Sequence, residues 1–119
     1  MAGKRILLVE DDGAVAEITA LLLRKFGHSP IVAWSVDSAM SIWAKTQGGF
    51  DLLIVDYLLG ARSGANLAIN LGKEKPTMPI ILMSGFHLSN IEIPDECVKF
   101  LSKPFTPEQL REAVESCFK

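Results

Sequence analysis

Short apolar runs alternate along this chain with longer segments whose apolar residues recur at helical spacing. Five runs have the length and composition of β-strands, and they lie at residues 5–9, 31–34, 52–55, 80–83 and 98–101. The first, third and fourth are apolar almost throughout, as strands covered on both faces are, whereas the second and fifth are mixed and are expected nearer the sheet edges. This alternation predicts an α/β fold, a doubly wound parallel sheet of five strands with helices on both faces.

The first helix signal follows the first strand. It runs from about Asp12 to Phe26 and stops before Gly27, a residue typical of helix C-termini. The positions expected to form its inward stripe are Val15, Ile18, Leu21, Leu22 and Lys25.

Three further helices are predicted from polar residues that can cap their N-termini. The capping residues are Ser35 or Asp37 for the first, Ser63 for the second and Thr106 for the third, where "TPEQ" also has the spacing of a capping box. The side chains expected to face inward are Ala39, Ile42 and Trp43, then Leu67, Ala68 and Leu71, then Leu110, Val114 and Cys117. Residues 86–97, between the fourth and fifth predicted strands, carry only a weak helical signal. The helix expected there, the fourth along the chain, should therefore be short or irregular.

Length and composition point to one domain. With 119 residues the chain can build one hydrophobic core, so residues 1–119 are expected to form a single domain. No apolar run approaches the roughly 20 residues of a membrane span, and acidic residues interrupt the N-terminal apolar run before a signal peptide could develop. A cytoplasmic protein without membrane contact is therefore expected.

Charge and the less common residue types narrow the picture further. The formal net charge is −2, and the Lys and Arg residues are scattered, which predicts no direct contact with nucleic acid. Cys97 and Cys117 lack the spacing of a zinc or redox pair and are interpreted as ordinary buried thiols. Packing or surface roles are expected for the other notable residues, namely His28 and His87 at the surface, Trp34 and Trp43 in packing, and Met40, Met78 and Met83 as core gap-fillers.

Polar and charged residues follow four of the five predicted strands. They are Glu10, Asp11 and Asp12 after the first strand, Asp56 after the third, Ser84 after the fourth and Lys103 after the fifth. Each alone is an ordinary loop residue, but a parallel sheet brings the carboxyl ends of its strands to one rim, where ligands bind. Two carboxylates about 4 Å apart repel by about 4 kcal/mol at an effective dielectric constant of about 20, so the acidic cluster favours a cation. A hard ion with oxygen ligands, Mg²⁺, meets that requirement.

Four segments together resemble the receiver domain of two-component response regulators. These are "ILLVEDD", "LLIVDYLLG", "ILMSG" and "FLSKPF", and the resemblance covers essentially the whole chain from Lys4 onward. It implies a flavodoxin-like sheet with strand order 2-1-3-4-5 and a phosphoacceptor signalling function. The implied partner is a histidine kinase or a histidine phosphotransfer domain, and the implied cofactor is Mg²⁺.

The resemblance also implies roles for individual residues. Asp56 matches the aspartate that takes a phosphoryl group from phosphohistidine. Glu10 and Asp11 match the acidic pair that holds Mg²⁺, and Leu58 matches a position whose backbone carbonyl is a further ligand. Ser84 and Lys103 match the hydroxyl and the ammonium that contact the phosphoryl group. Ser84 and Phe100 match the residues that switch on activation, and the Lys103–Pro104 peptide bond matches one that is cis in the family. Asp12 lies outside this set and is interpreted as a helix N-cap.

The sequence departs from the family pattern in three respects. Where many receivers have Met-Pro after the phosphoacceptor, this chain has Leu59–Gly60, and glycine leaves the backbone freer. Leu58 and Phe86 are apolar where polar side chains can help to orient an attacking water, so slow loss of an acyl phosphate is expected. The segment between Ser84 and Lys103, which is shorter than in most receivers, favours a phosphate relay or an appended receiver of a hybrid kinase over a transcription switch. Separately, a monomer or weak dimer is expected.

Other functions fit the same fold less well. A flavodoxin-like electron carrier needs a phosphate-binding loop after the first strand, where "VEDDGAVAE" places acid instead. A pseudo-receiver that binds a partner without phosphorylation would not need the complete set of acids, hydroxyl and lysine. A phosphatase of the D-x-D type would need an acid at Leu58. The chain is therefore expected to act as a signalling switch and not as a conventional enzyme, apart from self-phosphorylation and slow autodephosphorylation.

Overall fold

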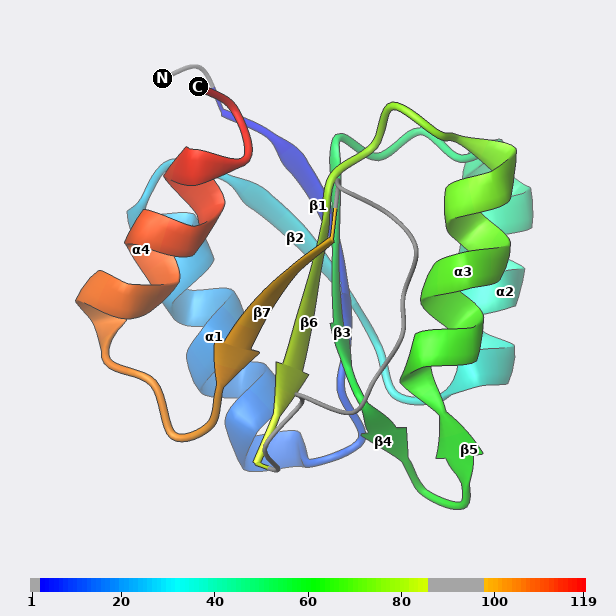
Figure 1. The fold of residues 1–119 in the computed structure, drawn as a ribbon, viewed down its shortest axis with the longest axis horizontal. Coiled ribbons are helices and arrows are strands. Elements are labelled where there is room, and N and C mark those ends of the chain that lie inside the picture. The colour runs from blue at the N-terminus through cyan, green and yellow to red at the C-terminus, as the bar shows by residue number, and fades with distance from the viewer. Residues whose placement is uncertain (1–2, 86–97) are drawn as a thin grey trace.

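The computed structural model describes residues 3–85 and 98–119, and a parallel sheet lies at its centre (Figure 1). The strands are β1 (Arg5–Val9), β2 (Ser29–Ala33), β3 (Leu52–Asp56), β6 (Ile80–Ser84) and β7 (Val98–Ser102), and each pairs in parallel with its neighbours in the order β2-β1-β3-β6-β7. This is the predicted order 2-1-3-4-5 when the two short strands β4 and β5 are left out of the numbering. The predicted edge positions of the second and fifth strands are also confirmed.

Helices cover both faces of the sheet. One face carries α1 (Gly13–Lys25) and α4 (Pro107–Ser116), and the other carries α2 (Val36–Thr46) and α3 (Gly64–Glu74) (Figure 1). Alternate residues of a strand point to opposite faces, so Ile6 and Leu8 pack with α1 and α4 whereas Leu7 and Val9 pack with α2 and α3. The continuous apolar runs of the central strands thus supply two cores at once.

The predicted helix caps are confirmed. Asp12 accepts hydrogen bonds from the backbone N–H groups of Ala14 and Val15, and Ser35 and Ser63 cap α2 and α3 in the same way. Thr106 and the residue three positions later form the predicted capping box at the start of α4. These caps fix where each helix begins relative to the strand before it.

The inward face predicted for α1 is wrong by about one residue. The buried residues are Ala16, Thr19, Ala20 and Leu23, whereas Ile18 and Leu21 are 57% and 48% exposed. One residue corresponds to about 100° of rotation around a helix. The prediction followed the largest apolar side chains, but small alanines face the sheet and allow the helix to approach it closely.

Several single-residue expectations are also corrected. His28 is buried, and its Nδ1 accepts a hydrogen bond from the backbone N–H of Lys4. Trp34 and Met40, by contrast, are exposed. Cys117 is half-buried and not fully buried. The weak fourth helix, His87, Phe86 and Cys97 all lie outside the described residues. Within residues 3–85 and 98–119, no helix is long and apolar enough to span a bilayer.

A short antiparallel hairpin between β3 and α3 was not predicted. It pairs β4 (Leu58–Leu59) with β5 (Arg62–Ser63), and Gly60 begins its two-residue turn with φ +63°. A positive φ at the first turn residue suits glycine and matches the twist of a hairpin. The hairpin places a structured loop directly after Asp56, as Figure 1 shows.

Candidate functional site

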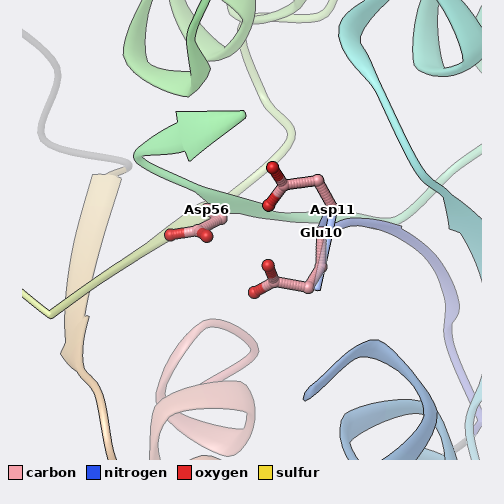
Figure 2. A group of neighbouring side chains, drawn as sticks. All are labelled: Glu10, Asp11 and Asp56. Carbon is pink, nitrogen blue, oxygen red and sulfur yellow. The ribbon is translucent and has the colours of Figure 1, made fainter. Parts of the chain in front are cut away.

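Three carboxylates meet at the carboxyl ends of the central strands. Glu10 and Asp11 follow β1, Asp56 ends β3, and the two strands are neighbours with Val9 opposite Val55. The nearest ligand oxygens of the three side chains all lie within 4.8 Å of one another. Figure 2 shows the three side chains directed toward a common space. The register of β1 against β3 therefore creates the predicted acidic cluster.

Lys103 joins this cluster from the end of β7. Its Nζ lies 2.8 Å from Glu10 Oε2 and 3.2 Å from Asp56 Oδ2. The Lys103–Pro104 peptide bond is cis, as the resemblance implies, and the Lys103 backbone N–H donates to the carbonyl of Ser84 at 2.8 Å. One ammonium group thus bridges two carboxylates that come from different strands.

Burial and charge shift the pKa values of two of these groups. Burial raises the pKa of the Glu10 carboxyl, the Lys103 hydrogen bond and the Asp12 N–H oppose this rise, and the charge of Asp56 adds to it. For Lys103, burial acts to lower the pKa, but the hydrogen bonds and charges of Glu10 and Asp56 together exceed that effect and raise it. Lys103 is therefore held in its charged form, as a fixed cation beside Asp56.

The remaining predicted residues, Ser84, Leu58 and Phe100, lie in three other strands. Ser84 is buried at the end of β6, opposite Ser102 and one residue beyond the position that pairs with Asp56, so it stands on the same rim. Leu58 lies in β4 with its side chain 44% exposed, and Phe100 is exposed on the edge strand β7. The geometry brings Glu10, Asp11, Asp56 and Lys103 together, with Ser84 at their strand ends.

Two glycines support the site in ways that the sequence pattern does not predict. The Gly60 N–H donates to Asp11 Oδ2 at 2.8 Å. A Cβ built on Gly64 would stand 1.7 Å from the Asp56 carbonyl oxygen, so only glycine fits there without displacing the backbone of Asp56. A Gly at the start of a capped helix is a weak sequence signal, and nothing in the sequence shows which backbone lies against it.

A family model described as the response regulator receiver domain matches residues 6–115. The chain belongs to this family. The receiver domain of the hybrid histidine kinase CckA has a TM-score of 0.83 and 31% identity, over 97% of this chain and 99% of that one. The response regulator TrrA of Thermotoga maritima, whose structure contains Mg²⁺ and BeF, has a TM-score of 0.84 and 25% identity, over 97% and 99% of the two chains.

Curated relatives are longer than this receiver. The phosphate regulon transcriptional regulatory protein PhoB of Pseudomonas aeruginosa is 27% identical over 92% of this chain and 49% of its own. The transcriptional regulatory protein YbdJ of Bacillus subtilis is 29% identical over 92% of this chain and 48% of its own. The chain thus spans about half the length of the curated relatives it matches. Because these relatives are transcriptional regulators, the expectation of no nucleic-acid contact gains no support.

Family membership establishes the broad function. Receiver domains are phosphoacceptor signalling domains of two-component systems, and this receiver has their fold and an acidic cluster at the expected rim. The flavin-carrier alternative is not favoured. The three carboxylates are also consistent with Mg²⁺ binding.

Proposed function

We propose that Asp56 accepts a phosphoryl group from a phosphohistidine of a partner histidine kinase or phosphotransfer domain. The observation that carries this proposal is the position of the Lys103 ammonium, 3.2 Å from Asp56 Oδ2 and 2.8 Å from Glu10 Oε2. The ammonium next to this carboxylate can compensate the negative charge of an incoming phosphoryl group. Phosphoryl transfer depends mainly on such positioning and charge neutralisation.

The donor set of the site fits Mg²⁺. Glu10, Asp11 and Asp56 offer hard oxygen ligands within 4.8 Å of one another, and one ammonium leaves their combined negative charge incompletely balanced. We assign the backbone carbonyl of Leu58 as a further ligand, as the resemblance to receiver domains implies for this position two residues after Asp56. When bound, Mg²⁺ supplies positive charge to the oxygens of the phosphoryl group.

The chain's own residues then perform the transfer. A carboxylate oxygen of Asp56 attacks phosphorus, the phosphorus–nitrogen bond of phosphohistidine breaks, and the electron pair stays with the imidazole. Lys103 pairs with an oxygen of the new acyl phosphate, and the Ser84 hydroxyl donates a hydrogen bond to another. Burial of Asp56 and Ser84, which are 8% and 1% exposed, limits the access of water.

In this proposal, phosphorylation changes a partner-binding surface, and the change begins when Ser84 moves toward the phosphoryl group. We propose that Phe100, which is 48% exposed on β7, changes rotamer as Ser84 moves and so alters a partner surface. The apolar side chain of Leu58 at the rim does not orient an attacking water, so the acyl phosphate decays slowly. We propose that the domain functions as a relay or appended receiver, as a monomer or weak dimer, and not as a conventional enzyme.

Intact-mass spectrometry tests the proposal. The chain is incubated with acetyl phosphate and Mg²⁺, and a single phosphate adduct is expected, absent with EDTA and absent in Asp56→Ala. Asp51→Ala is the matched control, because Asp51 is an exposed carboxylate outside the cluster. An adduct that persists in Asp56→Ala would refute the assignment, and no adduct on the unaltered chain would favour a phosphorylation-independent module. A ³²P decay lifetime of seconds at neutral pH would contradict slow decay.

A further inference from the structure

The turn of the β4–β5 hairpin reaches the acidic cluster through one hydrogen bond. The Gly60 backbone N–H donates to Asp11 Oδ2 at 2.8 Å, although the two residues are 49 positions apart in the sequence. Within residues 3–85 and 98–119, this is the one protein hydrogen bond that the Asp11 carboxylate accepts. Glu10, by contrast, is held by the Lys103 ammonium and by the Asp12 N–H. Asp11 therefore depends on Gly60 for its orientation.

The local backbone explains why glycine is needed here. Gly60 has φ +63°, a conformation that L side chains rarely adopt, and a Cβ built on it meets nothing within 4 Å. Space therefore does not exclude a side chain, but the dihedral angle disfavours most of them. Proline is unsuitable for two reasons: its φ is fixed at about −65°, and it has no N–H to donate. A proline at this position would therefore abolish the hydrogen bond to Asp11.

We propose that the Gly60 N–H is a positioning group for the divalent cation of this receiver. It fixes the Asp11 carboxylate through Oδ2 and leaves Oδ1 available as a ligand. Hydrogen bonds of this kind orient the groups that ligate a metal, and their loss typically lowers metal affinity by about 10–100-fold. The inference rests on the Mg²⁺ binding proposed above, and it assigns the first hairpin turn a part in that binding.

The expected effect is on metal affinity and not on folding. Asp11 and Gly60 are both exposed, so water can replace the hydrogen bond on each side and its loss costs the fold little. The bond restricts the rotation of one carboxylate in a cluster whose other two members are already held by Lys103. A divalent cation then meets three oriented ligands in place of two.

The test compares variants that differ in the N–H group at position 60. An ester analogue, in which oxygen replaces the peptide nitrogen of Gly60, removes the donor and keeps the freedom of glycine. Gly60→Pro removes the donor and also changes φ. Gly60→Asn is the matched control, because Asn keeps the N–H and tolerates a positive φ better than other side chains. Isothermal titration of each unphosphorylated chain with MgCl₂ gives Kd, and circular dichroism gives Tm.

The proposal predicts a Kd for Mg²⁺ raised about 10–100-fold in the ester analogue, with Gly60→Asn close to the unaltered chain. The amide proton of residue 60 should also shift on addition of Mg²⁺ in ¹H–¹⁵N spectra of the unaltered chain. Equal Kd values for the ester analogue and the unaltered chain would overturn the inference while leaving the proposed function intact. If the unaltered chain binds no Mg²⁺, the metal site itself is refuted. Should Gly60→Pro fail to fold, the ester analogue decides.

Discussion

Lys103 and Glu10 are joined by a 2.8 Å ion pair across 93 positions of the sequence. Glu10 is fully buried, and the Lys103 side chain is 20% exposed, so the pair lies largely out of water. The same ammonium reaches Asp56 at 3.2 Å. A single cation thus holds the buried acid and the proposed phosphoacceptor in one arrangement, and its removal should affect both folding and chemistry.

Lys103→Met should therefore lower both stability and phosphorylation. The change leaves Glu10 buried without its partner, which should cost about 1–3 kcal/mol of unfolding free energy after allowance for the partly exposed lysine. Urea unfolding at neutral pH measures this loss, and adduct formation with acetyl phosphate measures the chemistry. Lys73→Met, at an exposed lysine in the last turn of α3, is the control and should change neither. Unchanged phosphorylation in Lys103→Met would contradict the role proposed for the ammonium.

Gly64→Ala should displace the phosphoacceptor without altering any charged group. The new Cβ would stand 1.7 Å from the Asp56 carbonyl oxygen, so the backbone there has to move. Overpacking of this kind typically costs about 1–3 kcal/mol, and we expect phosphorylation at Asp56 to fall with it. Thermal unfolding and intact-mass spectrometry give the two readouts.

Gly13→Ala is the matched control for that change. Gly13 also begins a helix, but its added Cβ would approach only Trp34, at an ordinary 3.9 Å. We expect a stability equal to or above that of the unaltered chain, because alanine restricts the unfolded backbone more than glycine. If the two alanine variants behave alike, close contact with Asp56 is not what Gly64 provides.

The sequence predicted the sheet and the cluster for the same physical reason. Continuous apolar runs identify covered strands, and parallel strands bring their ends together. Glu10, Asp11, Asp56 and Lys103 could therefore be placed at one rim from the sequence alone. The side of α1 that faces the sheet could not be predicted, because Ile18 and Leu21 carry more apolar area than the alanines that actually face the sheet. The Gly60 hydrogen bond could not be predicted either, because a backbone N–H is present in every residue except proline and the residue type does not indicate its partner.

Acid should destabilise the fold through His28. Burial and the nearby charge of Lys4 lower the pKa of His28, and Glu115 only partly opposes this. Because the folded pKa lies below the unfolded value of 6.5, the contribution to stability is present above pH 6.5 and is lost as the pH falls through the folded pKa. Urea unfolding between pH 7.5 and pH 5 measures the slope. His28→Gln, which can still accept from the Lys4 N–H, should flatten it, and an unchanged slope would exclude His28 as its source.

On acidification, Mg²⁺ binding should begin to weaken at a higher pH than it would if Glu10 had the pKa of an ordinary glutamate. Burial raises the pKa of Glu10 above the usual 4.5, and only its charged form attracts the cation, so protons begin to compete with Mg²⁺ above that value. Titrations with MgCl₂ from pH 7 downward should show Kd rising as Glu10 takes up its proton. In Glu10→Gln the affinity should be lower throughout and this pH dependence should be reduced, because the neutral amide has no proton to gain. A pH profile identical in the two chains would place the titrating group elsewhere in the cluster.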